Sequence, residues 1–386
     1  MKNILKLNKI SSVCDEQFDS SFALSEDCAN PVGIVLRSFD MHEYALPETV
    51  LGVARAGAGT NNIPSSEYAE KGVVVFNTPG ANANAVKELV LTALLLGSRK
   101  VVDSIKWIDT LKGKGDEIPK LVEKGKKNFV GPEIQGKTLG IIGLGAIGIK
   151  VANSAIALGM NVVGYDPYLS VENALKISRA VVKVNELDDL IKSSDYITVH
   201  VPLLKDNAGF INAEMIAKMK DGAVVINCAR GELVNKQDMI NAVKSGKIAR
   251  HVTDFACEEY IGVENIVCTP HLGASTPEAE DNCAVMAAQQ LKDFIDNGNI
   301  VNSVNFPNCS SPKFGKNRVT CIHINKQNMI AKITTILGND GVNIENLVNK
   351  AKGDYAYMII DTDNDVTDEV LKDLSAVDGM IKVRKI

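Results

Sequence analysis

The chain has 386 residues, of which 45% are hydrophobic and 23% are charged, and its formal net charge at pH 7 is −5. This length and composition suit a globular protein with two or three domains. Because the chain is acidic and has no stripe of Lys and Arg residues with interleaved aromatic residues, we expect no nucleic-acid partner. No apolar run reaches the length of a membrane span, so we expect no membrane partner either.

The cysteines and the first residues favour a cytoplasmic location. The eight cysteines form no C-x-x-C pair and no cluster with the spacing of a metal site, which favours reduced thiols and no bound metal. The sequence after Met1 turns polar too early for a signal peptide. We therefore expect a cytoplasmic protein that holds no metal.

In chain order, residues 1–95 predict a small parallel α/β unit. Three apolar runs, each followed by a polar or glycine-containing turn, are expected to be its strands: 32–36, 50–54 and 72–76. A long amphipathic helix is expected over 84–100, with a continuation over 101–111. The charged, glycine-containing stretch 113–136 is expected to cross between two domains.

Residues 137–168 have the pattern strand, glycine turn, helix, strand and acid, which is typical of a dinucleotide-binding unit. Its three glycines follow the spacing G-x-G-x-x-G. Gly143 permits a tight turn, Gly145 lets the backbone approach a pyrophosphate, and Gly148 lets the helix pack close to the strand. The pyrophosphate would bind the free N–H groups at the positive end of the helix.

The acid that ends this pattern favours NAD as the cofactor. Asp166 follows the second strand and lies 18 residues after Gly148. That is close to the roughly 20 residues expected for a carboxylate that binds the ribose 2′-hydroxyl. Because the same carboxylate would repel a 2′-phosphate, the sequence predicts NAD rather than NADP.

Strands alternate with helices after this unit, which predicts a doubly wound parallel sheet. Ligands of such sheets gather at the carboxyl ends of the strands, where Arg230, Asp254 and His271 are expected. Arg230 could bind a substrate carboxylate and polarise an adjacent carbonyl. His271 could exchange a proton with a secondary alcohol, and Asp254 could accept a hydrogen bond from the nicotinamide carboxamide.

Each of these residues has an ordinary structural alternative. Arg230 could form a surface ion pair, His271 could anchor a loop, and Asp254 could cap a helix. Glu258 or Glu259 could orient His271 or belong to a solvated face. Three polar groups at successive strand ends of one nucleotide fold nevertheless favour a catalytic site.

The last third of the chain predicts a return to the first domain and then a further small domain. A helix is expected over 275–297, with Pro277 in its first turn. Residues 302–316, rich in Pro, Ser and Asn, predict a linker. Residues 317–386 then have the order βαββαβ, which is typical of a ferredoxin-like domain that could fold alone.

Several motifs resemble those of the D-isomer-specific 2-hydroxyacid dehydrogenases. They are GLGAIG (143–148) with Asp166, HVPL (200–203), INCARGELV (226–234), residues 254–259 and TPHLGAST (269–276). The resemblance implies that Arg230, Glu259 and His271 form the catalytic set. It implies NAD contacts at Thr78, Gly143, Gly145, Ala146, Ile147, Gly148, Asp166, His200, Val201, Pro202, Cys228, Ala229, Asp254, Gly273 and Ala274.

The resemblance also implies an architecture. A doubly wound Rossmann domain (96–284) would be inserted in a smaller α/β substrate domain (1–95 and 285–310), and a ferredoxin-like domain (317–386) would follow. It implies a homodimer or homotetramer. The substrate would be bound by four residues of the first segment: Arg55, Ala56, Gly57 and Arg37.

Two upstream segments narrow the implied substrate. ARAGAGTNNI (54–63) and NTPGANANAVKELV (77–90) are similar to the branch of the family that oxidises D-3-phosphoglycerate to 3-phosphohydroxypyruvate, the first step of L-serine biosynthesis. Two alternatives stay open: a dehydrogenase for another D-2-hydroxyacid, such as a phosphorylated erythronate, and a non-enzymatic NAD-sensing corepressor. The complete Arg, Glu and His set favours an enzyme.

The C-terminal segment resembles an ACT-type regulatory domain, which in some relatives binds L-serine. The implied effector residues are Asn325, Gln327 and Asn343. The loop 323–330 lacks the Pro-Gly pair that relatives carry, so L-serine sensing and a purely structural role both stay open. The catalytic loop also departs from the pattern, because only 12 residues separate Glu259 from His271 and Tyr260 replaces the usual Pro.

Overall fold

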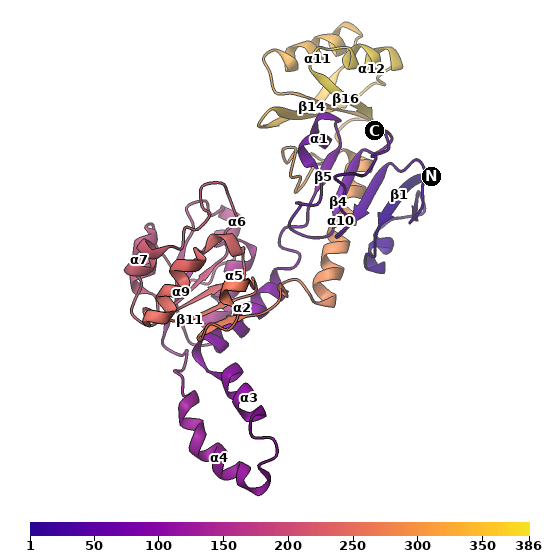
Figure 1. Cartoon of the computed structure of the whole chain (residues 1–386). Coiled ribbons are helices and arrows are strands. Elements are labelled where there is room, and N and C mark those ends of the chain that lie inside the picture. Colours follow the sequence, from indigo (N-terminus) through magenta and orange to yellow (C-terminus); the bar gives the residue numbers. More distant parts are fainter. The chain divides into compact units, whose positions relative to one another are not determined.

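The computed structural model describes residues 1–386 and divides into two compact units. The discontinuous unit contains residues 1–82 and 277–386, and the central unit contains residues 83–276 (Figure 1). The boundaries differ from those expected because two helices each stay whole within one unit. Helix α2 (Ala83–Ser98) lies in the central unit, and α10 (Pro277–Asn297) lies in the discontinuous unit. No helix combines the length and apolar character that a membrane crossing requires.

The central unit is built on a seven-stranded parallel sheet, as the alternation of strands and helices predicted. Its strand order is β12-β11-β10-β9-β6-β7-β8, so the chain reverses direction across the sheet between β6 and β9. Ligands of doubly wound sheets bind at the carboxyl ends beside such a reversal. The strands are β6 (Thr138–Ile142), β7 (Asn161–Tyr165), β8 (Val182–Lys183), β9 (Tyr196–Val199), β10 (Ala223–Asn227), β11 (Ile248–Thr253) and β12 (Ile266–Cys268).

Helices cover both faces of this sheet. Two separate apolar clusters form its core, and neighbouring residues of β6 divide between them, since Ile141 joins one cluster and Ile142 the other. One cluster holds α2 and α5 and the other α7, α8 and α9. The helices are α5 (Ala146–Ala157), α6 (Val171–Ala174), α7 (Leu187–Ser193), α8 (Ala213–Lys218) and α9 (Lys236–Ser245).

The segment after α2 follows the prediction in part. The helix expected over 101–111 is present as α3 (Val101–Asp109), which is separate from α2. We expected 113–136 to cross between domains, but α3 and α4 (Ile118–Gly125) form a hairpin within the central unit (Figure 1). No residue of either helix is buried. The rings of Trp107 and Phe129 pack 5.3 Å apart and close the hairpin, a contact that composition alone does not reveal.

The discontinuous unit begins with a five-stranded parallel sheet in the order β2-β1-β3-β4-β5. The three expected strands are present, and two further strands precede them. Helix α10 packs against this sheet, where Gly33 and Gly52 leave room for the Leu291 side chain. The elements are β1 (Lys2–Leu7), β2 (Phe22–Ser25), β3 (Gly33–Leu36), β4 (Gly52–Arg55), α1 (Ser65–Glu70) and β5 (Val74–Phe76).

Residues 317–386 form the expected βαββαβ order around an antiparallel sheet, β14-β15-β13-β16. One face of this sheet packs against α11 and α12, and residues of the other face join the apolar core around α10. The expected linker 302–316 is also packed, because Phe306 is fully buried. The elements are β13 (Asn317–Ile324), α11 (Met329–Asn339), β14 (Ile344–Lys352), β15 (Tyr355–Thr362), α12 (Asp368–Ser375) and β16 (Met380–Lys385).

Candidate active site

The glycine turn after β6 has the geometry that its sequence predicted. Gly143 has φ 96°, in the left-handed region that favours glycine. A Cβ on Gly148 would lie 2.0 Å from the Gly143 carbonyl oxygen, so a side chain there would force the helix away from the strand. Gly145 caps α5, and nothing lies within 4 Å of the position of its Cβ. The N-terminus of α5 is therefore open to an anionic group.

Asp166 lies beside this turn. Its carboxylate accepts hydrogen bonds from the Leu144 N–H at 2.9 Å and the Tyr168 N–H at 2.8 Å. The turn, the helix start and an acid at the end of β7 thus occupy one place on the sheet edge. This arrangement fits a dinucleotide whose pyrophosphate binds at α5 and whose ribose binds at Asp166.

The other expected cofactor residues of the central unit follow the ends of neighbouring strands. Ala146 and Ile147 form the first turn of α5. His200 follows β9, and burial lowers the pKa of its ring to about 4, so the ring is neutral at pH 7. The remaining residues follow β9, β10 or β12: Val201, Pro202, Cys228, Ala229, Gly273 and Ala274.

Arg230 is held by a residue that the sequence analysis missed. Asn227, the last residue of β10, is 1% exposed. Its Nδ2 donates to the Arg230 carbonyl at 2.8 Å, and its Oδ1 accepts from the Ala229 N–H at 3.1 Å. Thr253 Oγ1 donates to the Asn227 carbonyl at 2.8 Å. A polar residue that ends a buried apolar strand was the available signal for this positioning role.

Asp254 gathers three of the predicted residues around one carboxylate. It is 1% exposed, and neither carboxylate oxygen has a hydrogen-bond partner within 3.5 Å. Burial raises the pKa of Asp254, while the charges of His271 and Arg230 and the backbone of Gly273 act in the opposite direction. Two buried acceptor atoms without partners fit a ligand that donates hydrogen bonds, such as a carboxamide.

The structure does not join Glu259 to His271. The His271 ring packs against Phe255 with centroids 4.7 Å apart, and no ion pair within 4.0 Å involves it. Glu259 Oε1 instead lies 3.5 Å from Lys236 Nζ at the start of α9. The Glu259 backbone, the Cys257 thiol and Lys236 lower the pKa of Glu259, so its carboxylate is charged at neutral pH.

The expected substrate residues lie in the discontinuous unit. The Arg55 guanidinium lies over Gly57, where a Cβ would approach Nη1 to 2.4 Å. Thr78 is fully buried, and its N–H donates to the Gly57 carbonyl at 3.1 Å. Arg37 Nη1 pairs with Glu280 Oε1 at 2.5 Å, so its charge already has a carboxylate partner.

The three expected effector residues do not lie together. Asn325 follows β13, where its Nδ2 donates to the Gly353 carbonyl at 3.0 Å. Asn343 precedes β14, where its Nδ2 donates to Asp363 Oδ2 at 3.1 Å. Ile324 pairs with Tyr355 and Ile344 with Thr362, at opposite ends of β15. Gln327 is exposed on the Asn325 side.

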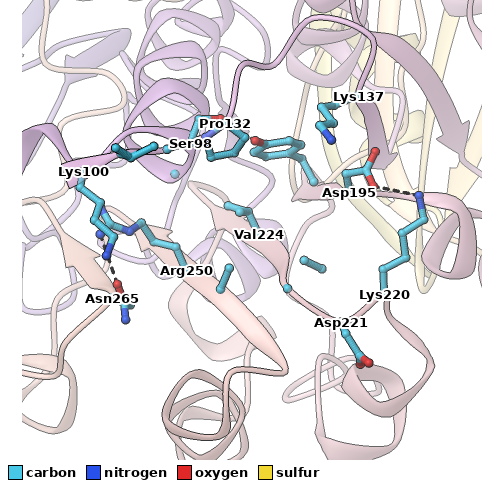
Figure 2. Close-up of a pocket in the computed structure, with 17 residues that line it drawn as sticks. Ser98, Lys100, Pro132, Lys137, Asp195, Lys220, Asp221, Val224, Arg250 and Asn265 are labelled. Carbon is cyan, nitrogen blue, oxygen red and sulfur yellow. Dashed lines mark hydrogen bonds and ion pairs between the residues drawn. The ribbon is translucent and has the colours of Figure 1, made fainter. Parts of the chain in front are cut away.

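A cavity lies at the opposite edge of the central sheet, where the strands begin. Its volume is about 310 Å³, and it is lined by residues near the starts of β10 and β11, including Val224 and Arg250. Figure 2 shows Lys220 paired with Asp195 at one end and Arg250 beside Asn265 at the other. None of the predicted cofactor or catalytic residues lines this cavity. It is therefore distinct from the site at the carboxyl ends.

Comparisons with known proteins show the family of the chain. Residues 92–273 match the family described as D-isomer specific 2-hydroxyacid dehydrogenase, NAD binding domain. The chain is 33% identical to the D-3-phosphoglycerate dehydrogenase of Haemophilus influenzae, over 84% of this chain and 78% of that protein. It is 38% identical to the enzyme of the same name from Methanocaldococcus jannaschii, over 72% of this chain and 51% of that protein. The match thus spans about half the length of the archaeal relative.

A solved structure extends this likeness. The NAD⁺-bound 3-phosphoglycerate dehydrogenase of Entamoeba histolytica is similar with a TM-score of 0.60 and 26% identity, over 79% of this chain and 98% of that one. The D-2-hydroxyisocaproate dehydrogenase structure is similar with a TM-score of 0.64 and 26% identity, over 79% of this chain and 100% of that one. The chain belongs to the D-isomer-specific 2-hydroxyacid dehydrogenase family.

Proposed function

We propose that this protein oxidises D-3-phosphoglycerate to 3-phosphohydroxypyruvate with NAD, the first step of L-serine biosynthesis. The observation that carries the proposal is the 33% identity to proteins named D-3-phosphoglycerate dehydrogenase from Haemophilus influenzae and Escherichia coli, each over 84% of the chain. Those matches include sequence from both compact units, so they cover more than the nucleotide-binding domain.

The residues of the central unit fit NAD. The open N-terminus of α5 would hold the pyrophosphate, Asp166 the ribose hydroxyls, and the two unpartnered oxygens of Asp254 the carboxamide. When bound, NAD supplies the acceptor for a hydride. The Asp166 carboxylate also disfavours the 2′-phosphate of NADP.

The protein's own residues would handle the substrate carboxylate and the hydroxyl proton. Arg230, fixed by Asn227, would bind the carboxylate and the adjacent oxygen in bidentate fashion. His271 would take the hydroxyl proton at a ring nitrogen as the carbonyl forms. Glu259 would move away from Lys236 and then stabilise the protonated His271 ring through its carboxylate. Arg55 would bind the phosphate.

We also propose self-association and a regulatory role for residues 317–386. Three apolar residues of α3 are exposed, namely Val101 at 44%, Ile105 at 57% and Ile108 at 44%, and a second copy of the hairpin would cover them. Because Asn325 and Asn343 lie at opposite ends of one sheet, L-serine binding by both would require two copies. Light scattering of the purified protein tests the first point. A monomer at micromolar concentration would contradict it.

The test of function is NADH consumption with 3-phosphohydroxypyruvate, with pyruvate and 2-oxoglutarate as competing substrates and with or without L-serine. We expect clear preference for the phosphorylated substrate. His271→Ala should lower kcat by about 10²–10⁴-fold while NADH still binds. Turnover that is unchanged in this variant would contradict the acid/base role. Absence of turnover with all three substrates would contradict the proposed function.

A further inference from the structure

A second cavity lies directly behind the loops that carry Arg230 and Glu259. Its volume is about 240 Å³, and its walls come from the ends of β10 and β11, residues 231–236, and the short 3-10 turn η5 (Glu258–Tyr260). No residue that we assign to NAD, to substrate or to catalysis lines it. The cavity is therefore separate from the proposed active site, although the same two loops form its walls.

Two buried polar atoms at this cavity have no hydrogen-bond partner. They are His251 Nε2 and the Tyr260 hydroxyl oxygen, on side chains that are fully buried and 5% exposed, respectively. Both residues line the cavity, and their rings lie 5.4 Å apart in an edge-on arrangement. Unpartnered buried polar groups are rare in folded proteins. Two of them at one cavity indicate an occupant that bonds to both.

The chemistry of the two atoms defines that occupant. His251 Nδ1 lies 3.0 Å from the Val225 carbonyl oxygen, an acceptor, so Nδ1 carries the hydrogen and Nε2 is an acceptor. Burial lowers the pKa of His251 to about 4, so the ring stays neutral at pH 7. The Tyr260 hydroxyl is free to donate. A single hydroxyl group satisfies both, because its oxygen accepts from Tyr260 while its hydrogen donates to Nε2.

The remaining walls disfavour a charged occupant. Val234, Phe255 and Ala256 line the cavity with apolar atoms, and the two charged residues of its lining, Glu232 and Lys236, are exposed to solvent, unlike the buried His251 and Tyr260. Burying a charge there without a partner would be costly. We propose that this cavity binds a small uncharged alcohol or polyol through one hydroxyl group held between Tyr260 and His251.

Binding there would act on the loop of Glu259. Tyr260 follows Glu259 directly in η5, so an occupant that bonds to the Tyr260 hydroxyl fixes the turn that carries the carboxylate. Asn227 also lines the cavity, and its side chain donates to the Arg230 carbonyl, so the cavity adjoins the Arg230 loop as well. This consequence for catalysis rests on the proposed function, whereas the binding itself does not.

The test measures binding of 1,2-propanediol and of erythritol to the full chain by saturation-transfer NMR, with no activity readout. Tyr260→Phe keeps the ring and removes only the hydroxyl, and should weaken binding about tenfold, the effect of one hydrogen bond. Ala256→Met fills the cavity while keeping both polar atoms, and should abolish binding. Tyr260→Phe should unfold at no lower temperature than the wild type, because the hydroxyl that it loses has no partner.

Three outcomes would overturn the inference. One is equal binding to the wild type and both variants, which would place the probes elsewhere. Another is no binding of either probe to the wild type. The third is a crystal structure soaked in the probe in which ordered water, and no probe, bridges Tyr260 and His251, because the cavity would then be a hydration site. Since none of these readouts uses turnover, failure of the proposed function and failure of this inference are distinguishable.

Discussion

Asp254 is a buried carboxylate in the central unit. Burial raises its pKa above the ordinary value, and neither oxygen has a hydrogen-bond partner. Asp195, in the same unit, is the opposite case. Burial alone would raise its pKa, but the Thr138 N–H and Lys220 lower it below the ordinary value. The two carboxylates therefore have opposite effects on stability as the pH changes.

We expect Asp254→Asn to raise the free energy of unfolding at pH 8 by about 1 kcal/mol. For an acid with a raised folded pKa, the unfolded chain loses its proton first, so stability falls as the pH rises through the window between the two pKa values. The gain should disappear near pH 3, where both states are protonated. Asp195→Asn should destabilise the protein at pH 8. Urea unfolding at both pH values measures this, and a destabilised Asp254→Asn at pH 8 would contradict it.

The residues of the active site differ in how far the sequence could reveal them. Arg230, Asp254 and His271 follow predicted strands, and parallel strands end at one edge, so their common location followed from topology. The Lys236–Glu259 contact could not be predicted, because it depends on how η5 packs against α9. The ring of Tyr260, the last residue of η5, contacts the ring of His251 on β11, and no local sequence pattern reports this contact.

At the scale of elements, the glycine turn and α5 form the part of the fold in which local signals agree most fully. β-branched residues, the glycine spacing and the following apolar periodicity all predicted one strand–turn–helix, and β6 and α5 lie there. The three glycines nevertheless have different roles. Gly148 is required for packing, because its Cβ would meet the Gly143 carbonyl, whereas Gly145 has open space around it.

Gly148→Ala and Gly145→Ala should therefore separate folding from cofactor binding. Gly148→Ala should destabilise the protein by about 1–3 kcal/mol, since backbone must shift, and should weaken NADH binding. Gly145→Ala should leave stability within about 0.5 kcal/mol of the wild type and weaken NADH binding by bringing a methyl group to the pyrophosphate position. Denaturant unfolding and NADH fluorescence titration measure both. If Gly145→Ala binds NADH as tightly as the wild type, the pyrophosphate is not at α5.

Other elements were mispredicted for a common physical reason. The stretches 113–136 and 302–316 are rich in Gly, Lys, Pro or Asn, which is typical of connections. In the structure the first forms one arm of a hairpin, which the contact between its Phe129 and Trp107 of α3 closes, and the second contains the fully buried Phe306. Tertiary contacts made by one or two aromatic residues outweigh the composition of such segments, and no local pattern reports them.

For the whole molecule, the C-terminal sheet belongs to the discontinuous unit, and two arginine side chains connect it to α10. Arg318 and Asp361 are both fully buried and form a two-bond ion pair, at 2.6 and 2.9 Å. The Arg318 guanidinium also donates to the Asn297 carbonyl at 2.8 Å, at the end of α10. Arg384, on β16, donates to the Ile295 carbonyl at 2.9 Å. Cations at the C-terminus of a helix stabilise it through the helix dipole.

Calorimetry should therefore detect two thermal transitions, one for each compact unit. NADH should raise the midpoint temperature of the central unit's transition, because a ligand that binds only the folded state stabilises that state. Arg318→Met leaves Asp361 buried without its partner and should destabilise the discontinuous unit by about 3–5 kcal/mol. Lys326→Met, which removes an exposed pair with Asp378, should leave the transition temperature of the discontinuous unit close to that of the wild type. If Arg318→Met lowered the midpoint temperature of the NADH-sensitive transition as much as that of the second transition, the two units would unfold together. If it lowered neither, the C-terminal sheet would not stabilise α10.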